Sequence, residues 1–200
     1  MLIMHNKMLY FVAFGPHEGG FGNSSHVFVA ESEYEMRMKL KAFLCDPCEQ
    51  PGLDMYYILE HLKESGYVTI ERSDKIMSTP NSANNITYTT KMSFSMREYD
   101  CGTDMKPWLY FILKDEGECG GPTTIIHLDT DPNAFKDKYI DVVCSTETFN
   151  DSNLALLKES VQDVIDKVPH HSVCKIVSDS MVAEFNTQGE YFCGKIRTKC

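Results

Sequence analysis

The fold class is decided by a stretch in which apolar and polar residues alternate, ITYTTKMSFSMR at positions 86–97. Its large apolar side chains, from Ile86 to Met96, fall on even-numbered positions, and Thr, Ser, Lys and Arg fill the odd ones. Successive side chains of a strand point to opposite faces of a sheet, so this pattern predicts a long antiparallel strand with one solvated face. We therefore expect a chain built around an antiparallel sheet.

Neighbouring segments extend this sheet. Residues 108–113, WLYFIL, are apolar throughout, which is typical of a strand buried on both faces. Residues 123–128 and 139–144 are the predicted partner strands, and two short strands are predicted at 173–177 and 191–196, near the end of the sequence. At the start of the chain, residues 8–14 and 26–30 read as the two strands of a hairpin.

Three helices are predicted. Ser32 followed by Glu35 has the spacing of a capping box and begins a helix that runs to about residue 44. A second amphipathic helix ends at Gly66, which is placed to adopt the left-handed conformation after the last turn. The third carries an apolar stripe behind the capping candidates at 150–152 and is ended by Pro169.

The order of these elements indicates the α+β class, with a mainly antiparallel sheet and three helices packed on it. We expect one domain over residues 1–200. The polar, turn-rich loop at 73–85 marks an alternative division into 1–72 and 86–200. No repeat of 20 to 50 residues is visible, which excludes a solenoid.

The charge balance is acidic, because 29 Asp and Glu stand against 19 Lys and Arg for a net charge of −10. This argues against a general nucleic-acid binder, which must neutralise phosphates. No apolar run approaches the roughly 20 residues that span a bilayer, and no signal-peptide cleavage site is visible. The eight cysteines form no disulfide framework, so we expect free thiols and an intracellular, cytoplasmic protein.

The most unusual composition lies in the glycine-rich loop at residues 15–25. It enters a strand rather than a helix and lacks the Lys-Ser/Thr ending of a phosphate loop. The simplest interpretation is a flexible hairpin loop, and the functional interpretation is a loop that contacts a ligand or a partner. The residues predicted to make these contacts are His17, Gly19, Gly20, Phe21, Asn23 and Ser24.

Cys45 and Cys48 have the spacing of a zinc knuckle or of a redox pair. A redox pair normally has its first cysteine at a helix N-terminus, whereas Cys45 follows a predicted helix. A zinc site needs a second pair, and Cys101, Cys119 and His61 are single residues. Free loop thiols are the favoured interpretation, with zinc at Cys45 and Cys48 as the alternative.

A buried strand also delivers His127, Asp129 and Asp131 at its end, and these are the candidate catalytic residues. An EF-hand calcium loop is excluded, because Ala134 replaces the required glycine. A facial triad of His127 and Asp129 with a histidine from 170–171 is a further interpretation. The simplest interpretation is an acidic, solvated turn.

The Asp-x-Asp spacing after a hydrophobic strand resembles the nucleophile motif of haloacid-dehalogenase-type phosphatases. The resemblance implies that Asp129 is the Mg²⁺-bound nucleophile and Asp131 the general acid. It also implies later motifs at strand ends, which residues 142–146 and 176–179 would supply. The alternative function is therefore a metal-dependent, phosphoesterase-like hydrolase.

Residues 58–72 and 86–89 predict helix, glycine, strand, loop and strand, the order in which a winged-helix recognition helix passes into its wing. This helix carries Glu60 and Glu64 against Lys63 alone, a poor surface for phosphates. A winged-helix-like nucleic-acid binder is a further alternative, and a protein contact suits the shape better.

No nucleophile elbow, kinase motif set or Rossmann fingerprint is present. Our leading hypothesis is therefore an accessory or regulatory protein, of viral, phage or other origin, that binds a protein partner through loops 15–25 and 73–85. It expects no enzyme activity, no cofactor and no membrane contact. A viral protein of this kind would work in the cytoplasm or nucleus of its host cell.

Overall fold

The structure is a computed structural model that describes residues 8–16, 26–44, 55–76, 86–102, 106–114, 124–146, 148–167, 175–176, 183–188 and 191–198. Its elements are β1 (Met8–Pro16), β2 (His26–Ala30), α1 (Glu33–Leu44), α2 (Met55–Ser65), β3 (Tyr67–Ile76), β4 (Ile86–Asp100), β5 (Trp108–Lys114), β6 (Thr124–Asp129), α3 (Pro132–Thr146), α4 (Asp151–Asp166), β7 (Lys175–Ile176), β8 (Ala183–Gln188) and β9 (Tyr191–Arg197).

The α+β class predicted from the sequence is confirmed. The strands form two sheets, a first sheet in the order β3-β4-β1-β2-β7 and a second sheet in the order β6-β5-β9-β8. All pairings are antiparallel except the short parallel one between β2 and β7. The described part of the chain holds four helices, one more than predicted.

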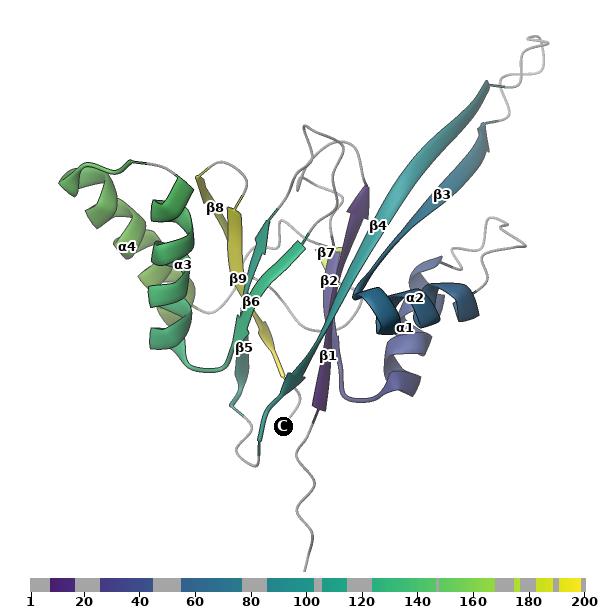
Figure 1. Cartoon of the computed structure of the whole chain (residues 1–200), viewed down its shortest axis with the longest axis horizontal. Helices are drawn as coiled ribbons and strands as arrows, with labels where there is room; N and C mark the ends of the chain where they lie inside the picture. Colours follow the sequence, from purple (N-terminus) through teal and green to yellow (C-terminus); the bar gives the residue numbers. More distant parts are fainter. Residues whose placement is uncertain are drawn as a thin grey trace, which may run out of the picture.

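These elements are stacked in four layers. The two sheets face each other, α1 and α2 cover the outer face of the first sheet, and α3 and α4 cover the outer face of the second (Figure 1). Each layer boundary is filled by its own cluster of buried apolar side chains. Burial of apolar surface at three boundaries, at about 25 cal/mol per Å², holds the layers together.

The layers explain why β1 and β5 are apolar on both faces. Phe11 of β1 points into the sheet-to-sheet core, whereas its neighbour Val12 points toward α1 and α2. In β5, Phe111 points into the same sheet-to-sheet core and Ile112 points toward α3 and α4. Both strands are therefore buried from two sides, as the continuous apolar run 108–113 predicts.

Local signals place the helix ends as predicted. The Glu35 N–H donates to Ser32 Oγ at 3.1 Å, and Glu35 Oε2 accepts from the Glu31 N–H at 2.8 Å, so the start of α1 is capped from both directions. At the end of α2, Gly66 has φ = 71° and donates its N–H to the Leu62 carbonyl at 3.0 Å. Asn150 caps α4 through its side-chain oxygen.

The predicted strand at 139–144 is wrong, because these residues lie in α3. Asp131 caps this helix and Pro132 occupies its first position, where the missing N–H costs nothing. The buried side chains Phe135, Tyr139 and Val143 recur every four residues, which is the period of a helix face. The β-branched residues between them gave the stretch the composition of a strand.

The predicted loop at 73–85 is too long. Residues 73–76 belong to β3, which pairs with β4 as far as Ile76 opposite Ile86. Residues 77–85 lie outside the described residues. The first sheet takes strands from both sides of this segment, and the number of domains stays a prediction.

The end of the chain differs in part from expectation. Of the strand predicted at 173–177, the described residues include only β7, and β8 was not predicted. The predicted strand at 191–196 is confirmed as β9. None of the helices described is both long and apolar enough to cross a membrane.

The two halves of the molecule repeat one arrangement. Elements β1-β2-α1-α2-β3-β4 form sheet order β3-β4-β1-β2, and β5-β6-α3-α4-β8-β9 form the equivalent order β8-β9-β5-β6. The central strands match in sequence, since residues 9–12 read LYFV and residues 109–112 read LYFI. Phe11 and Phe111 occupy equivalent positions and their rings lie 5.2 Å apart between the sheets. The unit is therefore a ββααββ arrangement repeated after one hundred residues.

The helix starts of the two units are equivalent as well. Each unit's first helix begins two residues after a strand, at a capping residue that is Ser32 in the first unit and Asp131 in the second. The carbonyls of these caps accept from the N–H groups of Met36 and Phe135, at 2.9 and 3.0 Å. Both of those residues are fully buried. The repeat thus extends from the sheets into the helices.

Candidate functional site

Several residues predicted to be functional lie outside the described residues. They include the contact loop candidates His17, Gly19, Gly20, Phe21, Asn23 and Ser24, and the zinc candidates Cys45 and Cys48. The strands that flank the glycine-rich loop, β1 and β2, are paired as predicted. The contact loop and the zinc site stay predictions.

His127 and Asp129 lie close together at the end of β6. His127 Nε2 is 3.5 Å from Asp129 Oδ2, and the two side chains are 26% and 25% exposed. The Nε2 atom is buried and has no hydrogen-bond partner among the described residues. Burial lowers the pKa of His127, and the Asp129 carboxylate partly opposes this shift. The imidazole is therefore held mainly in its neutral form at pH 7.

The carboxylates of Asp129 and Asp131 accept hydrogen bonds from backbone N–H groups. Asp129 Oδ1 accepts from the Asp131 N–H at 2.8 Å, and Asp131 Oδ1 accepts from the Asn133 N–H at 2.8 Å. The first bond makes a turn and the second caps α3. Tyr99 of β4 fixes the turn, because its hydroxyl accepts from the Thr130 N–H at 3.2 Å. The Asp-x-Asp spacing thus has a structural use at a strand-to-helix junction.

The other parts of the predicted metal site are not assembled in the same way. Residues 142–146, expected at a strand end, lie in the last turns of helix α3, so that part of the resemblance is wrong. Residues 177–179 and 170–171 lie outside the described residues. In the part of the chain that the structure describes, no three His, Cys, Asp or Glu side chains are grouped as metal ligands would be.

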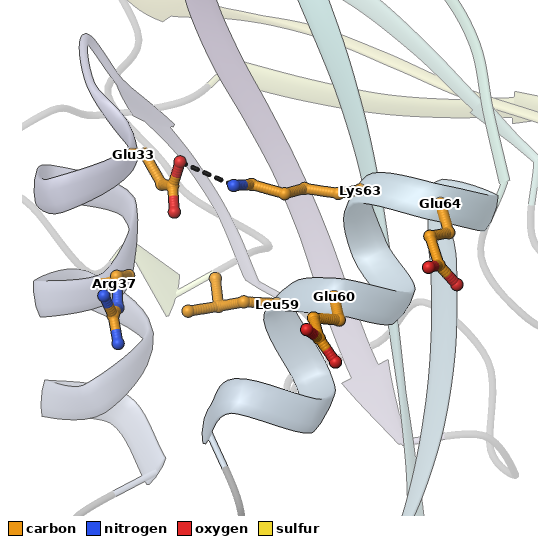
Figure 2. Close-up of a pocket in the computed structure, with 6 residues that line it drawn as sticks. All are labelled: Glu33, Arg37, Leu59, Glu60, Lys63 and Glu64. Atoms are coloured by element: carbon orange, nitrogen blue, oxygen red, sulfur yellow. Dashed lines mark hydrogen bonds and ion pairs between the residues drawn. The ribbon is translucent and has the colours of Figure 1, made fainter.

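The pair of helices on the first sheet forms the other candidate site. α1 and α2 pack side by side, and a groove of about 260 Å³ lies between them. Figure 2 shows the six residues that line it. They are Glu33, Arg37, Leu59, Glu60, Lys63 and Glu64.

One buried apolar side chain and one exposed ion pair link the two sides of the groove. Leu59 is 5% exposed and belongs to the core beneath the helices. Lys63 Nζ reaches across to Glu33 Oε2 at 2.6 Å, with both side chains more than 40% exposed. An ion pair this exposed is worth at most about 1 kcal/mol. The buried apolar side chains beneath the helices, Leu59 among them, therefore hold α1 and α2 on the sheet.

The remaining acidic side chains of α2 have no such partner. Glu60 and Glu64 are exposed, one turn apart, and Figure 2 shows them projecting from another side of α2 than Leu59 and Lys63. No ion pair is formed by either within the described residues. Like charges at this spacing cost about 0.2–0.5 kcal/mol in a helix. The two carboxylates therefore form a small negative surface beside the groove.

The solvent side of α1 carries large apolar side chains. Tyr34 is 73% exposed and Met38, one turn later, is 49% exposed. They lie opposite the buried side of the helix, which is formed by Met36 and Leu40. Among the described residues, the only other large apolar side chain with comparable exposure is Leu156 of α4. The apolar ridge, as we call Tyr34 and Met38, lies on the same helix as the groove-lining Arg37.

Sequence reasoning missed this surface. The signal was present, because Tyr34 and Met38 fall on the opposite side of the predicted helix from the apolar residues Met36 and Leu40. Single exposed apolar residues are common on protein surfaces, so the sequence pattern alone does not identify a binding surface. Only the packing of α1 shows that both side chains remain in solvent.

The structure agrees with the winged-helix hypothesis only in the order of the elements along the chain. α2, Gly66, β3 and β4 follow one another as predicted, but β4 also pairs with β1 inside the five-stranded sheet. The exposed side of α2 presents Glu60 and Glu64, which disfavours contact with phosphates.

A scan against protein-family models and searches of curated proteins and of solved structures gave no match.

Proposed function

We propose that this protein acts by binding a protein partner, and that the outward sides of α1 and α2 form the contact surface. The observation that carries the proposal is the apolar ridge, Tyr34 and Met38, left in solvent one turn apart. Exposed apolar side chains that adjoin each other mark interaction sites more often than isolated ones do. An accessory or regulatory role would be exerted through this binding.

The charge on α2, the helix that packs beside α1, indicates the kind of partner. Glu60 and Glu64 present two carboxylates that no cation in the described residues balances. A helical segment with apolar residues flanked by Lys or Arg would cover the ridge and neutralise the carboxylates. The groove between α1 and α2 receives such a segment as a third helix.

The test begins with a partner that is recovered with the purified full-length protein, identified, and then reconstituted from two pure components. The double variant Tyr34→Ser/Met38→Ser should weaken binding at least tenfold, because buried apolar anchors carry most of the energy of an interface. Leu156→Ser removes an equally exposed apolar side chain from α4 and is the matched control. Equal affinity of the double variant and the control would refute the proposal.

The acidic part of the surface has its own test. Glu60→Gln/Glu64→Gln should slow association and reduce its dependence on salt, because exposed charges act mainly by steering the encounter. Association rates of the reconstituted pair at low and high salt give the measurement. An unchanged salt dependence would remove the basic partner from the proposal.

Hydrolysis centred on His127, Asp129 and Asp131 is a second candidate function, favoured by the His127–Asp129 pair at the end of β6. The specific observation behind it is that the buried Nε2 has no hydrogen-bond partner among the described residues. Phosphate-ester hydrolysis by the purified protein with Mg²⁺, abolished by Asp129→Asn, would support this candidate. Absence of hydrolysis in the wild-type protein under those conditions would contradict it. Asn at 129 can still accept the Asp131 N–H, so the turn is kept.

A further inference from the structure

On the face of the β3–β4 hairpin that is turned toward the second sheet, buried polar side chains occupy positions where a sheet-to-sheet core normally has apolar ones. Ser93 and Ser95 of β4 are 1% and 6% exposed. Their cross-strand neighbours on β3 are Thr69 and Tyr67, whose hydroxyls are hydrogen-bonded to each other. The Ser93 hydroxyl is buried and has no hydrogen-bond partner among the described residues. Buried polar groups without partners are costly and therefore informative.

The repeat in the fold provides an internal reference for these positions. Ser95 pairs with Ala13 of β1, and the equivalent residue of the second unit, Phe192, pairs with Leu113 of β5. Phe192 is buried in the sheet-to-sheet core. Two residues further along, Arg97 in the first unit stands where the second has Gly194. At these two equivalent positions, the first unit therefore has a buried serine where the second has a core phenylalanine, and an arginine where the second has a glycine.

Ser95 and Arg97 line a cleft of about 330 Å³ between the hairpin and β6 of the facing sheet, whereas Ser93 is not among its described lining residues. The cleft is small for a ligand site but sufficient for a compact ligand. No Asp or Glu is among the described residues that line it. The lining residues are Ser65, Gly66, Tyr67, Ser95, Met96, Arg97, Thr124 and Ile125.

Arg97 is the one cation among those lining residues. Its Nη1 donates to the Ile126 carbonyl of β6 at 3.0 Å, which holds the guanidinium at the mouth of the cleft. No ion pair of Arg97 with a carboxylate is found in the described part of the chain. A guanidinium has five N–H donors, so most of its donors are left for another acceptor.

We propose that this cleft binds a compact anionic ligand, with Arg97 holding its phosphate or carboxylate group and the hydroxyls around Ser95 contacting its polar body. The planar guanidinium matches phosphate and carboxylate oxygens in pairs. Its attachment to the β6 carbonyl leaves it oriented before a ligand arrives, which lowers the entropy cost of binding. The cleft lies on the inner face of the first sheet, whereas α1 and α2 cover the outer face, so this inference is independent of the partner surface.

The experiment titrates full-length protein with inorganic phosphate, and separately with acetate, at constant ionic strength. Amide chemical shifts in the NMR spectrum are followed, and we expect saturable changes centred on Ser95, Arg97 and Thr124. Tighter binding of phosphate would identify a phosphate-bearing ligand, and tighter binding of acetate a carboxylate. Both outcomes support the anion site.

Arg97→Gln should weaken binding about tenfold, the effect of losing one charged hydrogen-bonding group. Arg197→Gln removes the same charge from an exposed position at the end of β9 and should leave the affinity unchanged. Arg97→Lys keeps the charge without the planar fork and should bind with intermediate affinity. Circular dichroism of each variant confirms that it is folded. Lack of saturation with both anions, or equal weakening by Arg97→Gln and Arg197→Gln, would overturn the proposal.

Discussion

The contact between Phe11 and Phe111 predicts that the two units stabilise each other directly. The rings are fully buried, their centroids lie 5.2 Å apart and their planes are inclined by 38°. This separation is in the range where aromatic pairs attract beyond the burial of their area. We expect the variants Phe11→Leu and Phe111→Leu to interact in a double-mutant cycle, because each removes one ring of the pair.

The magnitude follows from core substitutions of this kind. Each Phe→Leu change should lower the free energy of unfolding by about 1–2 kcal/mol, since most of the apolar volume is kept. The lost ring pair should appear as a coupling of about 0.5–1.5 kcal/mol. In a chain of 200 residues, each kcal/mol corresponds to roughly 2–4 °C in Tm.

Urea unfolding of the wild-type protein, both single variants and the double variant gives the coupling. Phe28→Leu combined with Phe111→Leu is the control cycle, because Phe28 packs against α1 and α2 on the other face of the first sheet. That pair should be additive within about 0.5 kcal/mol. A Phe11–Phe111 coupling no larger than the control would refute the idea that the two units share this contact.

Three further predictions concern the helix caps, the glycines and pH. Ser32→Ala and Asp131→Ala, at equivalent caps of the two units, should each cost about 1 kcal/mol in urea unfolding, whereas Asp131→Asn should cost much less because Asn also caps. Gly66→Ala should lower the Tm more than Gly102→Ala, since both have positive φ but only at Gly66 would the new Cβ lie 3.3 Å from a backbone oxygen; equal losses would contradict this. Burial lowers the pKa of His127 from 6.5, so its contribution to stability should be present above pH 6.5 and be lost as the pH falls through its lower folded-state pKa. Urea unfolding across pH 5–7.5 should therefore show a weaker pH dependence in His127→Gln, and an unchanged dependence would contradict the shift.

The candidate sites show how far motifs can be interpreted from sequence. His127 and Asp129 could be placed together, because a strand with one intervening residue puts both on the same side. The role of Asp131 could not be predicted, because an Asp before Pro serves equally as a metal ligand or as a helix cap. Asp131 is a cap only if residues 132–146 form a helix, and the β-branched composition of residues 139–144 indicated a strand. The apolar ridge on α1 likewise depends on what packs around the helix.

Local sequence patterns were enough to predict the α+β class, the long alternating strand, the burial of β5 on both faces and the caps of α1, α2 and α4. These features depend on side chains within a few residues of one another, so local periodicity and capping chemistry are enough to predict them. The repeat of the ββααββ unit, the face-to-face sheets and the polar cleft at Arg97 became apparent only in the folded chain. They join residues that are far apart in the sequence, 29 positions for Arg97 and Ile126 and one hundred for Phe11 and Phe111. The LYFV and LYFI strands are too short a match to reveal a repeat until the fold places Phe11 against Phe111.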